Sequence, residues 1–175
     1  SAASDVYKRQ HFISVLGRSE KVSLSSNYKN TVFDVAFRPD GVHLVVAVGN
    51  RVMVYDAETG DLMHSLKGHS DYVYAVAYSS DSKRFASGGA DKTIIIWTSS
   101  CEGMLKYNHK WSIQCLAYNP VTHQLVSATE KDFGLWSPQK KNVQKFEVSA
   151  KVLCCAWTND CLLYTSDAAD EEDSV

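Results

Sequence analysis

Hydrophobic and polar positions along this chain repeat with a period of about forty residues. An apolar residue, an alanine and an aromatic residue occur together four times, with the alanines at positions 36, 77, 117 and 156, which are 41, 40 and 39 residues apart. Turn-forming residues follow each triplet, and an aromatic residue ends a β-rich run at Tyr55, Trp97 and Trp136. A period of this length is typical of units that bury their apolar faces against copies of themselves.

Within one repeat the pattern predicts short β-strands. In the second repeat the segments 72–78, 84–88, 93–97 and 104–107 are rich in apolar and β-branched residues, and clusters of Asp, Ser and Gly separate them. The run 94–97 (IIIW) is too short for a helix and suits a strand that is covered on both faces. Four strands in every forty residues are typical of one blade of a propeller. The predicted fold class is therefore all-β, an incomplete propeller of about three four-stranded blades plus the first strand of a fourth.

The same markers predict where each blade begins and ends. Residues 30–67 form blade 1, 68–107 blade 2, 108–147 blade 3 and 148–160 the start of blade 4, while 11–29 have no clear pattern. Residues 1–10 and 161–175 resemble the two strands of one translated sequencing adapter, so we expect both ends not to be native protein. Three blades and one strand cannot close a ring. We therefore expect the isolated chain to expose apolar blade faces, and to aggregate or be partly molten.

Composition narrows the class of function. The 175 residues are 45% hydrophobic and 22% charged, as in an ordinary globular chain, and no apolar run is long enough to insert directly into a membrane. Excluding both ends removes two bases and six acids and changes the net charge from −2 to +2, and neither value indicates a nucleic-acid partner. The cysteines and glycines have no spacing that predicts a disulfide framework, zinc site or nucleotide loop, so no cofactor is expected.

The second repeat also contains a set of polar residues: His69 after Gly68, then Ser87, Asp91 and Trp97. These residues and their order resemble the WD-repeat β-propeller family. The resemblance implies a structural tetrad, a hydrogen-bonded chain from Trp through Ser and His to Asp that locks the strands of a blade. Such a chain would satisfy a buried indole N–H, a hydroxyl and an imidazole at once.

A hydrolase triad made of His69, Ser87 and Asp91 is the catalytic alternative. Ser87 is not within a G-x-S-x-G elbow. The third repeat carries a partial copy of the set, His109, Ser127 and Trp136, at nearly the same offsets. An active site needs one copy, whereas a structural lock recurs from blade to blade, so we predict that the chain is not an enzyme. The third repeat is one residue shorter after Ser127, which leaves open whether Asp132 completes its lock.

Several strings are also similar to the N-terminal propeller of one family of intraflagellar transport complex A subunits: 61–69 (DLMHSLKGH), 83–92 (KRFASGGADK), 118–125 (YNPVTHQL), 132–138 (DFGLWSP) and 154–160 (CCAWTND). This resemblance implies a non-catalytic scaffold in retrograde ciliary transport and cilium assembly, with other complex A subunits and ciliary cargo adaptors as partners. It also implies a location in the cytoplasm, the cilium and the ciliary base. The alternative is a WD-repeat substrate receptor or scaffold of another assembly. Tyr72 and Trp111, at the starts of first strands, are possible partner contacts, or else pack between blades.

Overall fold

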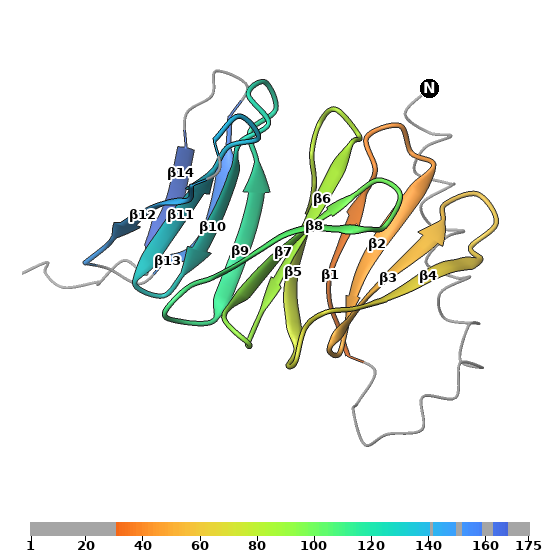
Figure 1. Cartoon of the computed structure of the whole chain (residues 1–175), viewed down its shortest axis with the longest axis horizontal. Coiled ribbons are helices and arrows are strands. Elements are labelled where there is room, and N and C mark those ends of the chain that lie inside the picture. The colour runs from red at the N-terminus through yellow and green to blue at the C-terminus, as the bar shows by residue number, and fades with distance from the viewer. Residues whose placement is uncertain (1–30, 141, 150–151, 159–162, 168–175) are drawn as a thin grey trace, which may run out of the picture.

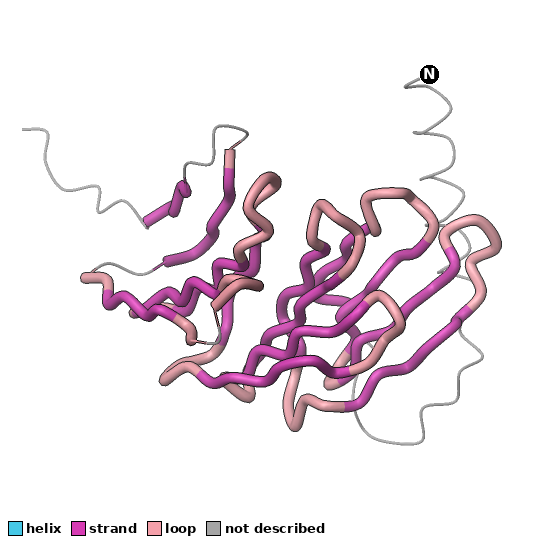
Figure 2. The backbone as a smooth tube through the Cα atoms, turned by 45° about the horizontal axis from the view of Figure 1, so that its top comes forward, coloured by secondary structure: helices cyan, strands magenta, loops and turns pink. Residues whose placement is uncertain are grey.

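The structure is a computed structural model that describes residues 31–140, 142–149, 152–158 and 163–167. The described part contains strands and loops, in antiparallel sheets that lie side by side (Figures 1 and 2). The strands are β1 Val32–Phe37, β2 His43–Val48, β3 Arg51–Asp56, β4 Leu62–Lys67, β5 Val73–Tyr78, β6 Arg84–Gly89, β7 Thr93–Thr98, β8 Gly103–Asn108, β9 Ile113–Tyr118, β10 Leu125–Thr129, β11 Asp132–Trp136, β12 Gln144–Glu147, β13 Val152–Trp157 and β14 Leu163–Asp167.

Each blade is a meander, because every strand pairs with the next one along the chain. Strands β1–β4, β5–β8 and β9–β12 form three four-stranded sheets, and β13 and β14 form a two-stranded one. The predicted three blades and the beginning of a fourth are therefore confirmed. The fourth sheet has two strands where one was predicted, because the backbone of 163–167, within the end that we expect not to be native, pairs with β13. Residues 1–10, 11–29 and the rest of 161–175 lie outside the described residues, and the origin of both ends stays a prediction.

The first strands of successive blades lie next to one another and share an irregularity. Strand β1 contacts β5, β5 contacts β9, and β9 contacts β13. Each of these strands has a register shift near its start where it pairs with the second strand of its blade, for example between Val73 and Ala75 and between Val152 and Cys154. A bulge increases the local twist and releases a residue from the ladder. Beside this irregularity in β5, the Val73 N–H donates to the Gly49 carbonyl of the preceding blade at 2.8 Å.

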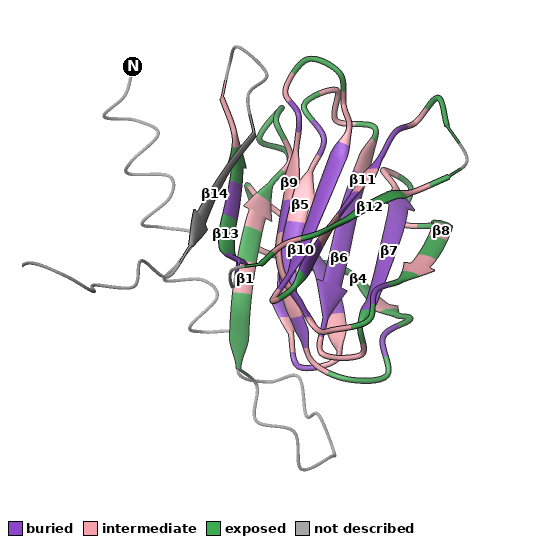
Figure 3. Cartoon of the chain, turned by 90° about the vertical axis from the view of Figure 1, so that its left-hand side faces the viewer, coloured by how far each residue is buried: buried purple, intermediate pink, exposed green. Residues whose placement is uncertain are grey.

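The core consists of the central strands and the seams between blades (Figure 3). Strand β7 is buried over Thr93–Trp97, as expected for a β-branched strand that is covered on both faces. Strand β1, at the edge of this array, leaves Val32, Phe33, Val35 and Phe37 between 40% and 53% exposed. In a closed propeller another blade would cover this apolar face. Within the described part of the chain, no helix could cross a membrane.

Candidate functional site

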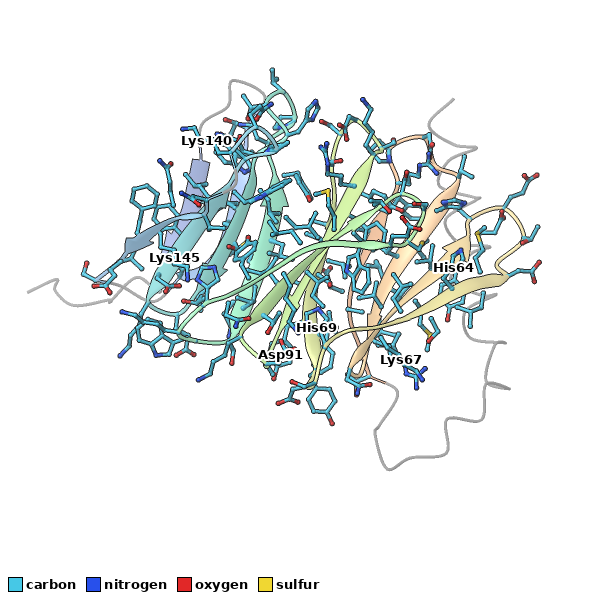
Figure 4. All side chains as sticks on the ribbon, in the orientation of Figure 1. His64, Lys67, His69, Asp91, Lys140 and Lys145 are labelled. Carbon is cyan, nitrogen blue, oxygen red and sulfur yellow. The ribbon has the colours of Figure 1, made fainter. Side chains whose placement is uncertain are left out.

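A chain of hydrogen bonds in the second blade joins its strands to its loops. The Trp97 indole N–H donates to Ser87 Oγ at 2.9 Å, and this oxygen lies 2.8 Å from His69 Nε2. His69 Nδ1 in turn lies 3.0 Å and 3.1 Å from the two carboxylate oxygens of Asp91, in the turn after β6. Figure 4 shows His69 and Asp91 close together at one end of the blade. The structure thus brings together all four residues of the predicted tetrad, and we call this set the blade 2 lock.

The proton positions in the blade 2 lock follow from its acceptors. A carboxylate only accepts, so His69 donates from Nδ1 and its Nε2 accepts the Ser87 proton. Asp91 also accepts from the backbone amides of Ser70 and Thr93, both at 3.1 Å. Burial lowers the pKa of His69 below its ordinary value, and this effect outweighs the opposing charge of Asp91. The imidazole is therefore neutral at physiological pH and relays hydrogen bonds without carrying a charge.

The third blade has a related set, which we call the blade 3 lock. His109 Nε2 lies 2.9 Å from Ser127 Oγ, and His109 Nδ1 lies 2.7 Å from Asp132 Oδ1. The Thr129 hydroxyl donates to the same Asp132 oxygen at 2.7 Å. Asp132 thus occupies the place of Asp91 despite the shorter turn. Burial likewise lowers the pKa of His109.

Trp136 does not occupy the place that the sequence predicted for it. Within the described residues no hydrogen bond joins Trp136 to Ser127, and the indole packs in an apolar cluster with Leu116 and Leu125. The donor is instead the hydroxyl of Tyr107, which donates to Ser127 Oγ at 3.3 Å from strand β8 of the preceding blade. The blade 3 lock therefore crosses the seam between blades, whereas the blade 2 lock does not.

Small residues at different places make room for the two locks. A Cβ on Gly68, the residue before His69, would lie 2.7 Å from the side chain of Ile95 and 3.1 Å from that of Trp97. The equivalent position in the third repeat is Asn108, whose side chain does not let an indole approach as closely as Trp97 approaches Gly68. Opposite Ser127 lies Gly134, where a Cβ would lie 3.0 Å from the Ser127 hydroxyl. The missing side chain therefore keeps the space around this hydroxyl open.

The geometry of the two locks does not suit nucleophilic catalysis. Ser87 and Ser127 are fully buried, so a substrate cannot reach either hydroxyl without disrupting the blade. Ser87 Oγ also accepts the indole N–H of Trp97, which uses a lone pair that a nucleophile would direct at its substrate. Among the described residues, no group of three or more His, Cys, Asp or Glu side chains could hold a metal ion. The arrangement serves to satisfy buried polar groups.

Tyr72 and Trp111 precede strands β5 and β9 and lie at the same rim as the His69 and Asp91 loops. The Tyr72 ring lies 5.5 Å from that of Phe33, so part of its surface packs against the neighbouring blade. Two lysine side chains lie over the Trp111 ring: the Nζ of Lys110 and the Nζ of Lys131 are each 5.8 Å from the ring centroid. Trp111 therefore combines an aromatic surface with positive charge. The position of Tyr72, in contrast, is partly explained by its packing between blades.

Comparison with known proteins identifies the family. The family model for the IFT122 first β-propeller matches residues 31–168 of this chain. The chain belongs to this family. It is 58% identical over 141 residues, 81% of its length, to the intraflagellar transport protein 122 homolog of Xenopus tropicalis. It is 60% identical over 141 residues to that of Danio rerio, and 57% over 132 residues to that of Homo sapiens. The chain spans 11–12% of the length of these relatives.

Solved structures confirm the fold. Structures described as the RRP9 WD40 repeats and as U3-55K both superimpose on this IFT122-family chain with a TM-score of 0.69 and 24% identity. They cover 75% of this chain, which in turn covers 43–44% of theirs. This level of identity shows the WD40 propeller fold alone. The predicted fold class and the predicted family are both confirmed.

Proposed function

We propose that this chain forms part of a non-catalytic protein-interaction scaffold of intraflagellar transport complex A, in retrograde ciliary transport and cilium assembly. The observation that carries the proposal is the match of residues 31–168 to the IFT122 first β-propeller, with 57–61% identity to vertebrate homologs. The implied partners are other complex A subunits and ciliary cargo adaptors. The implied location is the cytoplasm, the cilium and the ciliary base, without nucleic acid or direct membrane insertion.

Within this scaffold, both locks serve to hold the blades rigid. Their serine hydroxyls are buried and their histidines are neutral, which suits a structural role and not a hydrolase. A rigid blade fixes the loops at its rim, and rigid elements position contact residues better than mobile ones do. His69, Ser87, Asp91 and Trp97 would thus support binding indirectly.

We assign Trp111 as the better of the two candidate contacts. Lys110 and Lys131 flank its ring, and the Lys110 side chain is 68% exposed. Lys110 pairs with Glu147 at 3.1 Å, which is an exposed pair and therefore weak. An acidic partner segment could replace Glu147 while a side chain packs on the indole. Tyr72 would contribute at the edge of the same surface.

The test uses full-length IFT122-family protein containing this segment, expressed in ciliated cells that lack their own copy. We expect Trp111→Ala to reduce co-precipitation of at least one complex A subunit severalfold and to slow retrograde transport. The control is Val121→Ala, a 63% exposed residue in the β9–β10 loop, at the opposite end of the same blade. Equal recovery of every subunit with both variants would exclude Trp111 as a contact. Recovery of no complex A subunit by the unmodified protein would overturn the scaffold assignment itself.

The same experiment decides the alternative function. A WD-repeat substrate receptor of another assembly would recover that assembly, for example ubiquitin-ligase subunits, in place of complex A. The 57–61% identity to intraflagellar transport homologs favours the first proposal.

A further inference from the structure

Two thiols meet across the seam between the third and fourth blades. Cys115 lies on β9 and Cys155 on β13, the first strands of neighbouring blades. Their Sγ atoms are 3.1 Å apart, and the backbone N–H of Cys155 also donates to Cys115 Sγ at 3.3 Å. Both cysteines are in the free thiol form. The spacing of cysteines in the sequence predicted no role for either residue, because the two are forty positions apart and match no short cysteine motif.

The repeat shows that Cys115 occupies the position of an anion. Between the first and second blades, the N–H of Val76 donates to a carboxylate oxygen of Asp34 at 2.9 Å. Asp34 and Cys115 both lie two residues before the repeated alanine, and Val76 and Cys155 both lie one residue before it. The Cys115 sulfur thus accepts the same bond across a blade seam that a carboxylate accepts elsewhere.

The two donors from Cys155 favour the thiolate of Cys115. Together with a smaller contribution from the Cys154 side chain, they lower the pKa of Cys115 to about 6, with burial opposing the shift. The same contact raises the pKa of Cys155, which keeps its proton and donates it. Cys115 is partly exposed, whereas Cys155 is buried. One thiol is therefore a reachable nucleophile, and the other is held against it as a thiol that can resolve an oxidised intermediate.

We propose that Cys115 and Cys155 form an oxidation site, at which a peroxide converts the two thiols into a disulfide that joins blade 3 to blade 4. The Cys115 thiolate attacks one peroxide oxygen, the O–O bond breaks, and hydroxide leaves to give a sulfenic acid. The Cys155 sulfur then attacks the Cys115 sulfur, the S–O bond breaks, and water leaves with the Cys155 proton. The two thiols lose two electrons, and one hydrogen peroxide is reduced to two waters. Bond formation requires the sulfurs to approach by about 1 Å, to the ~2.05 Å of a disulfide.

The exposed neighbour Cys154 is the main competitor for this chemistry. It precedes Cys155 at the bulge of β13, and the negative charge of Cys115 raises the pKa of its thiol. The Cys154 side chain also interacts with Cys115 and lowers the pKa of Cys115, but less strongly than Cys155 does, whose Sγ lies 3.1 Å from Cys115 Sγ and whose backbone N–H donates to the same sulfur. Geometry therefore selects Cys155, and a disulfide through Cys154 is the outcome that would contradict the proposal.

The test treats full-length protein with a small excess of hydrogen peroxide, blocks free thiols with N-ethylmaleimide and digests it with trypsin without reductant. Cleavage after Lys110, Lys131 and Lys151 places Cys115 and Cys155 on separate peptides. We expect a linked pair whose mass is two hydrogens below the sum of both peptides plus one N-ethylmaleimide for each cysteine that stays free, Cys154 among them, and which dithiothreitol separates. Fragmentation of this pair assigns the bond to Cys155 or to Cys154 in the unmodified protein, so the result does not depend on a variant that folds.

Variants sharpen the assignment. Cys115→Ala and Cys155→Ala should each reduce the linked pair at least tenfold, whereas Cys154→Ala should keep it. Cys101→Ala is the matched control, because Cys101 is a partly exposed free thiol on another blade. The oxidised protein should also melt at a higher temperature than the reduced protein. Full alkylation of both peptides, further oxidation of Cys115 without a link, or a link through Cys154 would each overturn the proposal.

Discussion

The second and third blades each satisfy a buried serine hydroxyl with hydrogen bonds, but they use different partners to do so. In both, the buried serine hydroxyl donates to a histidine and accepts from another side chain. The histidine in turn contacts an aspartate, which lies in the turn after the second strand in blade 2 and at the start of the third strand in blade 3. In blade 2 the donor to the serine is the Trp97 indole of the same sheet. In blade 3 it is the Tyr107 hydroxyl from the neighbouring sheet. The His-Ser pair is thus the constant part of the lock, and the last donor varies.

This difference changes which parts of the molecule each lock connects. The blade 2 lock ties β6 and β7 to the loop before β5 and to the turn between β6 and β7, and so stabilises one sheet. The blade 3 lock also ties the outer strand of blade 2 to the second strand of blade 3. An indole N–H is fixed in direction, whereas a phenol hydroxyl can rotate to another acceptor. We therefore expect loss of the donor to cost more free energy in blade 2 than in blade 3.

The largest effect is expected from Asp91→Ala. Its carboxylate accepts from His69 and from the backbone amides of Ser70 and Thr93, and the substitution leaves these donors without their partner. The free energy of unfolding of the complete propeller should fall by roughly 1–3 kcal/mol. Urea denaturation measures this change, with Asp61→Ala, an exposed acid, as the control. Equal midpoints for Asp91→Ala and the unmodified protein would show that the lock does not stabilise the fold.

The next largest effect is a difference in stability between variants of the two buried tryptophans. Trp97 and Trp136 are 6% and 4% exposed, so replacement by Phe removes a similar amount of buried surface at each. Only Trp97 donates to a lock serine. Trp97→Phe should therefore destabilise the propeller by about 1 kcal/mol more than Trp136→Phe does. The two variants are compared in the same denaturation experiment. A larger loss for Trp136→Phe would contradict the assignment of the donors.

Tyr107→Phe should have a smaller effect. The Tyr107 bond to Ser127 is 3.3 Å long, which is long for an O–H···O hydrogen bond, so its loss should cost about 0.5 kcal/mol. Tyr118→Phe is an informative control, because the buried Tyr118 hydroxyl has no hydrogen-bond partner among the described residues. Removing that hydroxyl should be neutral or stabilising. The proposal of a donor role for Tyr107 is not sustained if both variants melt at the same temperature.

The sequence was informative where one repeat holds the whole set of interacting residues. All members of the blade 2 lock lie between His69 and Trp97, so fixed offsets within a repeat predict their association. Tyr107 could not be found in this way, because it belongs to the repeat before that of Ser127 and acts across a seam. Asp132 was left open because its turn is shorter, and the Thr129 hydroxyl supplies part of what the longer turn supplies in blade 2.

Of the features of this structure, the contacts between blades are the least predictable from the sequence repeat. The offsets show that Asp34 and Cys115 are equivalent, yet an acid and a thiol share no pattern that a sequence motif would reveal. Only the strand packing shows that each accepts an N–H from the following blade. Blade strands and turns follow from local propensity, whereas the chemistry of each seam depends on which two side chains meet there.

The smallest effect concerns pH. His69 and His109 both have pKa values lowered by burial in the folded state, so below the ordinary histidine pKa of about 6.5 the unfolded chain binds more protons than the folded one. Stability should therefore be full near pH 7.5 and decline as pH falls from about 6.5 toward the lower folded pKa values. Melting temperatures of the complete propeller from pH 7.5 to 5 measure this decline. The pH-dependent loss should be reduced in His69→Gln, which removes one titrating group. A melting temperature that rises on acidification would show that at least one lock histidine is charged in the folded protein.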